Sequence, residues 1–125
     1  GNHYGKYFLF FFLLATKYSD TQLIGKESYY MYDGKDLIIK NKDKEYIYDD
    51  NYKFDLTKSI ININSLKNES KQEIITFLKN KSKDNNFVKN HCKTKQFLSI
   101  DKFNFIKDLY KYNSINKIDT ELIDI

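Results

Sequence analysis

The chain has no arginine, no proline and no tryptophan, and it has one cysteine among its 125 residues. Lysine therefore supplies every one of the 21 basic side chains. Arginine is the better residue for two-pronged recognition of a phosphate or carboxylate group. Its absence indicates the coding bias of an AT-rich genome rather than a functional demand. For this reason the abundance of lysine is only weak evidence for nucleic-acid binding.

The scarcity of cysteine and glycine excludes several classes of protein. The single Cys92 rules out an intramolecular disulfide framework and a multi-cysteine metal site. The four glycines, at positions 1, 5, 25 and 34, lack the spacing of a glycine-rich phosphate-binding loop. A nucleotide-dependent enzyme is therefore disfavoured. A free thiol slightly favours a reducing cytoplasm, and an exported domain whose leader has been removed is the alternative.

The composition is otherwise that of one soluble domain. The chain is 41% hydrophobic and 30% charged, with a formal net charge of +4. A chain of 125 residues can bury about two-thirds of its unfolded surface, which is enough for one core. We find no repeat and no linker, and we expect a single α+β domain over residues 1–125.

Residues 6–15 form the longest apolar run, KYFLFFFLLA. The run is too short to cross a bilayer, which takes about 20 residues. It has the size of the apolar part of a signal peptide, but Ala15-Thr16-Lys17 makes a poor cleavage site. The absence of polar residues favours a strand covered on both faces inside the core, while a buried helix stays open.

Residues 27–48 carry the clearest structural pattern, a three-stranded antiparallel meander. Asp33-Gly34 is a favoured two-residue hairpin turn, and as such it would pair Tyr30 with Leu37. A second turn at Lys42-Asp43 would then set Ile38 beside Ile47. In this register one face of the sheet carries aromatic and aliphatic side chains: Tyr30, Tyr32, Leu37, Ile39, Tyr46 and Tyr48.

The pattern changes after a further expected strand at residues 52–56. Apolar residues at helical spacing predict one helix over residues 65–81 and another over residues 102–112, the second with Asp101 as its N-cap. The tail, residues 115–125, alternates loosely and could add an edge strand. The predicted fold is therefore an antiparallel β-meander of four to five strands packed against two C-terminal helices.

No constellation of residues points to catalysis, a cofactor or a metal. His91 and Cys92 are sequence neighbours, so their side chains point apart, and the other histidine is His3. The acidic run from Asp49 to Asp55 lacks the glycine and the terminal glutamate of an EF-hand loop. We therefore predict no catalytic, cofactor-binding or metal-ligating residue.

The sequence favours a non-enzymatic module that works by protein–protein contact, in the manner of small accessory, inhibitor or immunity proteins. Tyrosine is enriched at protein interfaces, so the tyrosine face is the candidate contact surface, with nearby lysines attracting an acidic partner. The predicted partner-binding residues are Tyr30, Tyr32, Lys35, Lys40, Tyr46 and Tyr48.

Two alternatives remain for the function. One is a weak, sequence-independent nucleic-acid binder that uses the lysine-rich residues 67–95. The other is an exported ligand-binding domain with an apolar cavity. We expect no membrane span, and the oligomeric state is left open.

Overall fold

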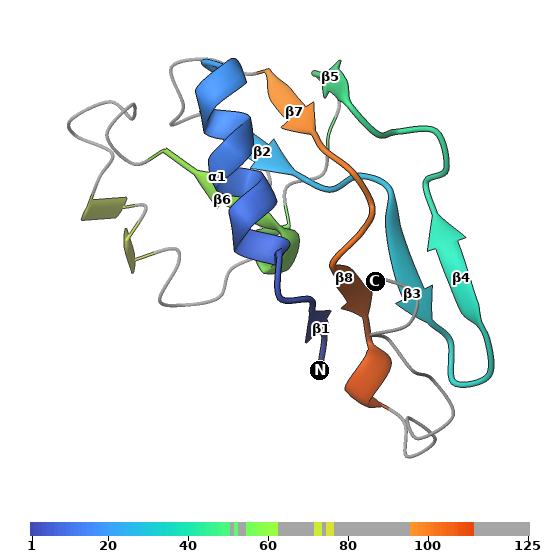
Figure 1. Ribbon diagram of the computed structural model, residues 1–125. Coiled ribbons are helices and arrows are strands. Elements are labelled where there is room, and N and C mark those ends of the chain that lie inside the picture. Colours follow the sequence, from blue (N-terminus) through green and yellow to red (C-terminus); the bar gives the residue numbers. More distant parts are fainter. Residues whose placement is uncertain (51, 53–54, 63–71, 74, 77–95, 112–125) are drawn as a thin grey trace.

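The computed structural model describes residues 1–50, 52, 55–62, 72–73, 75–76 and 96–111. In this part of the chain, strands form two four-stranded sheets (Figure 1), a first sheet with the order β1-β8-β3-β4 and a second with the order β5-β7-β2-β6. The strands are β1 (His3–Tyr4), β2 (Leu23–Gly25), β3 (Tyr29–Tyr32), β4 (Leu37–Lys40), β5 (Ile47–Asp49), β6 (Ser59–Ile61), β7 (Phe97–Ser99) and β8 (Phe105–Lys107). The helical elements whose bounds are described are α1 (Phe8–Tyr18) and two 3-10 turns, η1 (Leu56–Lys58) and η4 (Leu109–Lys111).

Two segments distant in sequence run in parallel from the second sheet into the first. One segment passes from β2 to β3 and the other from β7 to β8, with β2 parallel to β7 and β3 parallel to β8. Leu23 lies opposite Phe97 and Tyr30 opposite Ile106, so the second segment has two more residues between its strands. A turn absorbs them, in which Asn104 has a φ of 64°.

The predicted hairpin at Asp33-Gly34 exists, but its register is wrong by two residues. Tyr32 pairs with Leu37 and Tyr30 with Ile39. The Asp33 carboxylate accepts hydrogen bonds from the backbone N–H groups of Lys35 (2.9 Å) and Asp36 (2.7 Å), which widens the turn to residues 33–36. These two bonds also lower the pKa of Asp33. Because the shift is an even number of residues, each side chain keeps its expected face.

The predicted pairing of the third strand of the meander with the second is wrong. β5 pairs antiparallel with β7 in the second sheet, with Ile47 opposite Ser99. Between β4 and β5 the backbone adopts positive φ at Asn41 (51°), Asp43 (70°) and Tyr46 (54°), and this turns the chain away from the first sheet. The register of the β3–β4 hairpin therefore could not be used to predict the partner of residues 46–48.

The predicted packing of a single meander against two C-terminal helices is also wrong. Residues 102–112 contain β8 and η4, because positive φ angles at Asn104 (64°) and Asp108 (61°) interrupt a helix there. Asp101 accepts a hydrogen bond from the Phe103 N–H (3.0 Å), but in a turn and not at a helix start.

Other predicted elements are shifted or lie outside the described residues. Of the strand expected at residues 52–56, residues 53 and 54 are not described, Tyr52 and Asp55 lie in no strand, and Leu56 begins η1. Tyr52 is buried against the ring of Phe97. Within residues 65–81 the structure describes four residues, Gln72, Glu73, Ile75 and Thr76, and these are helical. Residues 115–125 are not described.

For the apolar run at residues 6–15 the favoured strand inside the core is wrong, and the helix that was left open is what forms. Most of it belongs to α1, which lies across the second sheet (Figure 1). Phe12 and Ala15 of α1 pack with Ile24, Leu98 and Ile100 in one core cluster. A second cluster in the first sheet joins Tyr32, Ile106 and Leu109. Periodicity could not separate the two structures, because the run has no polar residue to mark an exposed face.

Candidate functional site

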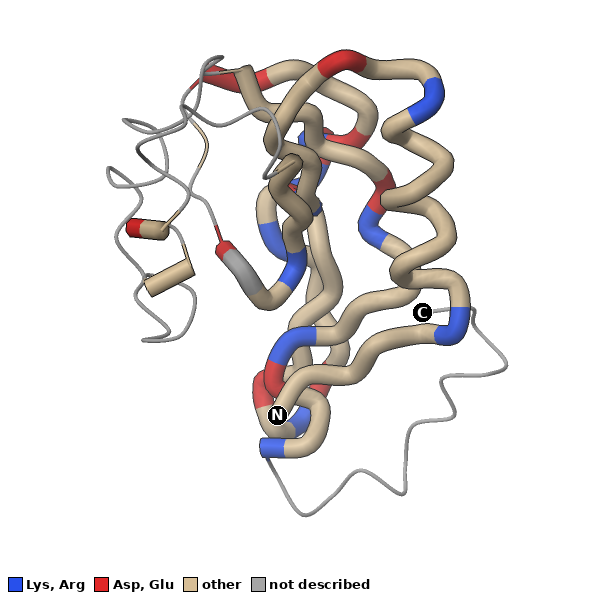
Figure 2. The backbone as a smooth tube through the Cα atoms, turned by 90° about the vertical axis from the view of Figure 1, so that its left-hand side faces the viewer, with Lys and Arg blue, Asp and Glu red and all other residues tan. Residues whose placement is uncertain are grey.

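The outward side of α1 is apolar and exposed. Four of its side chains, between 42 and 57% exposed, form what we call the α1 face: Leu9, Phe10, Leu13 and Leu14. Figure 2 shows that the backbone of α1 carries no acidic or basic residue between its two ends. A helix that is apolar on all sides is normally covered on all sides. The second sheet covers one side, so the α1 face is a candidate contact surface.

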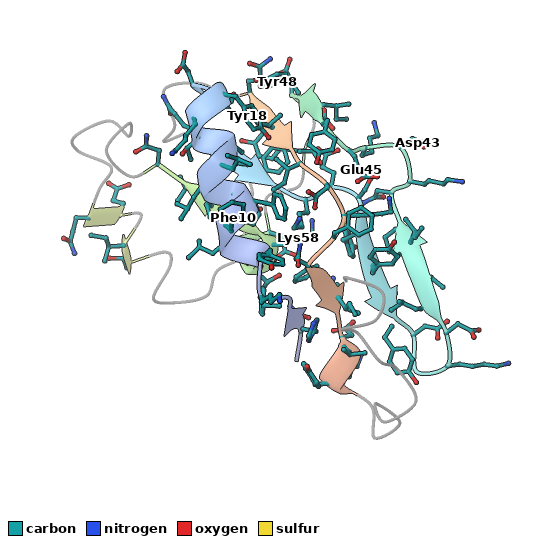
Figure 3. The ribbon with its side chains drawn as sticks, viewed as in Figure 1. Phe10, Tyr18, Asp43, Glu45, Tyr48 and Lys58 are labelled. Atoms are coloured by element: carbon teal, nitrogen blue, oxygen red, sulfur yellow. The ribbon has the colours of Figure 1, made fainter. Side chains whose placement is uncertain are left out.

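Three exposed tyrosines extend this surface at the C-terminal end of α1. Tyr18, Tyr46 and Tyr48, the tyrosine cluster, are 51 to 64% exposed. The hydroxyl groups of Tyr48 and Ser19 are hydrogen-bonded (2.9 Å), and Figure 3 shows Tyr48 near Tyr18 at the end of the helix. The Tyr46 hydroxyl donates a hydrogen bond to Asp101 (3.2 Å). These rings offer apolar area together with a polar tip.

The six residues predicted from the sequence to bind a partner lie in different parts of the structure and differ in exposure. Tyr32 is buried in the core of the first sheet, and Tyr30 is half-buried against the ring of Phe103. Lys35 and Lys40 are exposed, in the β3–β4 turn and at the end of β4. Tyr46 and Tyr48 lie instead at the second sheet, beside α1. One sheet face carrying all six does not form, because β5 left the meander, and partner contact by these residues stays a prediction.

Sequence reasoning missed the α1 face. The run was assigned to the core as a whole, so none of its residues was considered as a site. One signal was available: the nine residues 7–15 contain no charged or amide side chain, so a helix formed by them needs cover on two sides. The predicted sheet could cover one side of such a helix, but nothing else in the predicted fold was assigned to the other side.

A buried ion pair joins the two parallel segments close to this surface. The Lys26 ammonium group donates to the Asp101 carboxylate (Oδ1, 3.0 Å) and to the Asp101 carbonyl (2.7 Å). It also lies 5.5 Å from the centre of the Phe12 ring. Burial lowers the pKa of Lys26, and the charge of Asp101 opposes this effect. The pair fixes the turn at Asp101 against the start of the β2–β3 connection.

A second polar cluster lies where the β2–β3 connection meets β5 and η1. Burial, followed by a hydrogen bond with Asp49, raises the pKa of Glu27 to about 7. Burial lowers the pKa of Lys58 to about 8, and its ammonium group donates to the Lys26 carbonyl. Such values suit acid–base chemistry. Lys58 and the Oε1 atom of Glu27 are buried, while Glu27 as a whole is half-buried, and neither residue lines the pocket described below.

Glu27 makes the stability of the chain depend on pH. Its pKa is about 7 in the folded chain against an ordinary 4.5, so its contribution to stability is fully present below pH 4.5 and is lost as the pH rises to 7. Replacing Glu27 with glutamine should remove this loss. We expect the variant to gain about 1 to 2 kcal/mol over the wild type between pH 4 and pH 8, a figure reduced for partial exposure.

Urea unfolding at the two pH values measures this effect. Asp36→Asn, at an exposed turn carboxylate, is the matched control and should not show the gain. A wild-type stability that does not fall between pH 4.5 and 7 relative to Glu27→Gln would contradict the shifted pKa.

A pocket opens between α1 and the turn that precedes β5. It has a volume of about 230 Å³ and is lined by Phe11, Leu14, Tyr18, Tyr46, Ile100 and Asp101. Leu14 belongs to the α1 face, while Tyr18 and Tyr46 belong to the tyrosine cluster. The pocket therefore adjoins both parts of the exposed surface.

Other predicted chemistry can be placed only in part. Within the described ranges no three His, Cys, Asp or Glu side chains gather as a metal site would require. His3 is hydrogen-bonded through Nδ1 to the Tyr110 hydroxyl (2.8 Å). His91, Cys92 and the lysine-rich residues 67–95 fall mostly or wholly outside the description. In the described portion, helices are too short or too polar to span a membrane.

Comparison with known proteins gives no relative from which a function could be transferred. No protein-family model, curated protein or solved structure matches this chain.

Proposed function

We propose that this chain is a small binding module that holds a protein partner on the α1 face and acts without catalysis. The observation that carries the proposal is the exposure of Leu9, Phe10, Leu13 and Leu14 on one side of a helix whose other side is core. Full burial of a leucine or phenylalanine side chain contributes about 1.5 to 3 kcal/mol. These half-exposed side chains therefore retain a large part of that energy for association.

The surroundings of the α1 face favour a protein over a lipid surface. The tyrosine cluster lies beside the face, and the hydroxyl groups of Tyr48 and Tyr46 are hydrogen-bonded to Ser19 and Asp101. Fixed aromatic rings with oriented polar tips are typical of protein contact sites. A lipid surface has no fixed shape to match them.

Charge at the edge of the face indicates one property of the partner. Lys6 and Lys17 are both exposed, one before the start of α1 and one in its last turn. No acidic residue lies in the first turn of the helix. Acidic side chains at the rim of the partner surface should therefore speed association and set the orientation of the complex.

A paired set of variants tests the proposal. Leu9→Ser combined with Leu13→Ser removes the centre of the α1 face, and Ile39→Ser on β4 removes an apolar side chain of comparable exposure elsewhere. Proteins retained from the native organism by the wild type are purified, and their binding to the wild type and to each variant is measured by calorimetry. We expect the face variant to lose affinity at least about tenfold, or about 1.4 kcal/mol, and Ile39→Ser to change it little.

Equal binding by both variants would overturn the proposal. Sedimentation of the chain alone and flotation with anionic lipid vesicles are run in parallel. If the face variant abolishes self-association or vesicle binding instead of binding to a purified partner, the α1 face serves a second copy or a membrane, and the proposal is wrong. Circular dichroism confirms that both variants keep their structure.

A further inference from the structure

The pocket beside α1 combines apolar walls with one carboxylate. Phe11, Leu14 and Ile100 supply aliphatic and aromatic wall, and the largely exposed Tyr18 and Tyr46 also line the pocket. Asp101 is the acidic residue among those that line it. A cation on an apolar stem is the ligand type that such a combination favours, because aromatic rings and a carboxylate both attract positive charge.

The two oxygens of Asp101 differ in how far they are occupied. Oδ1 accepts from the Lys26 ammonium and from the Phe103 N–H, each at 3.0 Å. Among the described residues Oδ2 accepts only the Tyr46 hydroxyl, at 3.2 Å, which is long for a bond between two oxygens. A carboxylate oxygen has room for two donors. Oδ2 can therefore take a further donor, or exchange the phenol for a stronger one.

Tyr46 is held in an unfavourable backbone conformation at this point. Its φ is 54°, in the left-handed region that a bulky side chain rarely adopts. The side chain is largely exposed, yet its hydroxyl reaches back to the buried Asp101. Strained residues of this kind collect at binding sites, where a partner can exploit the strain.

Asp101 acts on both phenols at the pocket mouth, even though its Oδ1 atom is paired with Lys26. Burial raises the pKa of Tyr46 to about 12, and the charge of Asp101 is the next cause. The pKa of Tyr18 is raised by burial first and then by Asp101 as well. Glu45 adds in the same direction at Tyr46, although it is paired with Lys102 (2.8 Å). The charge of Asp101 therefore reaches both phenols, and an entering ammonium group would meet it at Oδ2, the oxygen that Lys26 does not hold.

We infer that this pocket receives a lysine side chain of the protein partner, whose ammonium group binds Asp101 Oδ2 while its aliphatic stem lies on Phe11, Leu14 and Ile100. The inference rests on the proposed function and specifies the chemistry of the partner. Arginine fits less well, because a guanidinium group seeks two oxygens and Lys26 occupies the other one. An ammonium group needs a single acceptor.

The size of the pocket agrees with this ligand. Its volume is about 230 Å³. A water molecule in the liquid takes about 30 Å³, so the pocket has room for a butylammonium group with water still present. Tyr18 and Tyr46 line the pocket, so their rings would lie beside the bound side chain.

A titration with blocked amino acids tests the inference on the intact chain. The probes are Nα-acetyl-lysine amide, the arginine analogue, and the norleucine analogue, which keeps an apolar stem but has no charge. Binding is followed by shifts of the backbone N–H signals of Tyr18, Tyr46 and Ile100. We expect the lysine probe to bind with a Kd on the order of 1 to 10 mM and the other two to bind at least about fivefold more weakly.

Two variants separate the contributions of the site without removing Asp101. Tyr46→Phe removes the hydroxyl that competes for Oδ2 but keeps the ring, and should tighten lysine binding about threefold. Tyr18→Ala removes one wall and should weaken it. Tyr110→Ala, at an exposed tyrosine on η4, is the matched control and should leave the Kd unchanged.

Equal binding of lysine and norleucine probes would overturn the inference, as would the absence of shifts at these positions up to about 50 mM probe. Weaker lysine binding by Tyr46→Phe would also overturn it, because Oδ2 would then not be the acceptor. These outcomes do not bear on the proposed role of the α1 face, since Leu9 and Leu13 do not line the pocket. Conversely, loss of partner binding through the α1 face would not alter the titration.

Discussion

Replacing Asp101 with asparagine is expected to lower the free energy of unfolding by about 3 to 5 kcal/mol. The variant leaves the Lys26 ammonium, which is 1% exposed, buried without its counter-ion. It also weakens the clamp between the two parallel segments that connect the sheets. Because burial already lowers the pKa of Lys26, the unpaired amine can lose its proton, and the deficit should shrink as the pH rises.

Urea unfolding at pH 7 measures this loss, and a second ion pair supplies the control. The Glu45–Lys102 pair is of similar length (2.8 Å) but both side chains are partly exposed. Glu45→Gln should therefore lose no more than about 1 kcal/mol. Equal losses from Asp101→Asn and Glu45→Gln would show that the Lys26–Asp101 pair does not hold the two segments together.

The second large effect is expected from Phe12→Ala, which should lower the free energy of unfolding by about 3 to 5 kcal/mol. The Phe12 side chain is 0% exposed and packs with Ala15, Ile24 and Leu98 in the core of the second sheet. Its removal leaves a cavity beneath α1. It also removes the ring that lies against the Lys26 ammonium group.

Phe10→Ala is the matched control, because it makes the same substitution in the same helix. The side chain is exposed on the α1 face, so we expect a change of less than about 1 kcal/mol. The gain in helix propensity is the same for both variants, so the difference between them measures burial alone. Equal losses at the two positions would contradict the orientation of α1.

The sequence predicted the turn between β3 and β4 correctly, and the error in its register has a local cause. Asp33-Gly34 predicted a hairpin, and a hairpin forms. The register was off because the Asp33 carboxylate binds two backbone N–H groups and widens the turn. The alternation of side chains between the faces survived, since a shift by two residues preserves it.

The pairing of strands that are distant in sequence could not be predicted. β5 does not pair with β4 but with β7, where Ile47 lies opposite Ser99 and Asp49 opposite Phe97. No local pattern around residues 47–49 indicates that residues 97–99 are their neighbours. The positive φ angles at Asn41, Asp43 and Tyr46 that redirect the chain are tolerated by Asn and Asp but are not expected for Tyr. The same event divided the predicted site, because Tyr46 and Tyr48 moved with β5.

The α1 surface shows a different limit of sequence reasoning. An unbroken apolar run indicates that burial is favourable, but it does not indicate how many sides of the element are buried. Only the arrangement of the second sheet shows that Phe12 is covered while Phe10 is not. The pocket likewise depends on the approach of Asp101 to α1, and no spacing in the sequence encodes that approach.

Thiol labelling tests the exposure of the α1 face most directly. A cysteine is placed at Leu13 or at Ala15, each in a Cys92→Ser background, and the rate of alkylation by iodoacetamide is measured under native conditions. A cysteine at position 13 should react nearly as fast as one in an unfolded peptide, while one at position 15 should react at least about 100-fold more slowly, because it must wait for local opening. Equal protection at both positions would contradict an exposed apolar helix face.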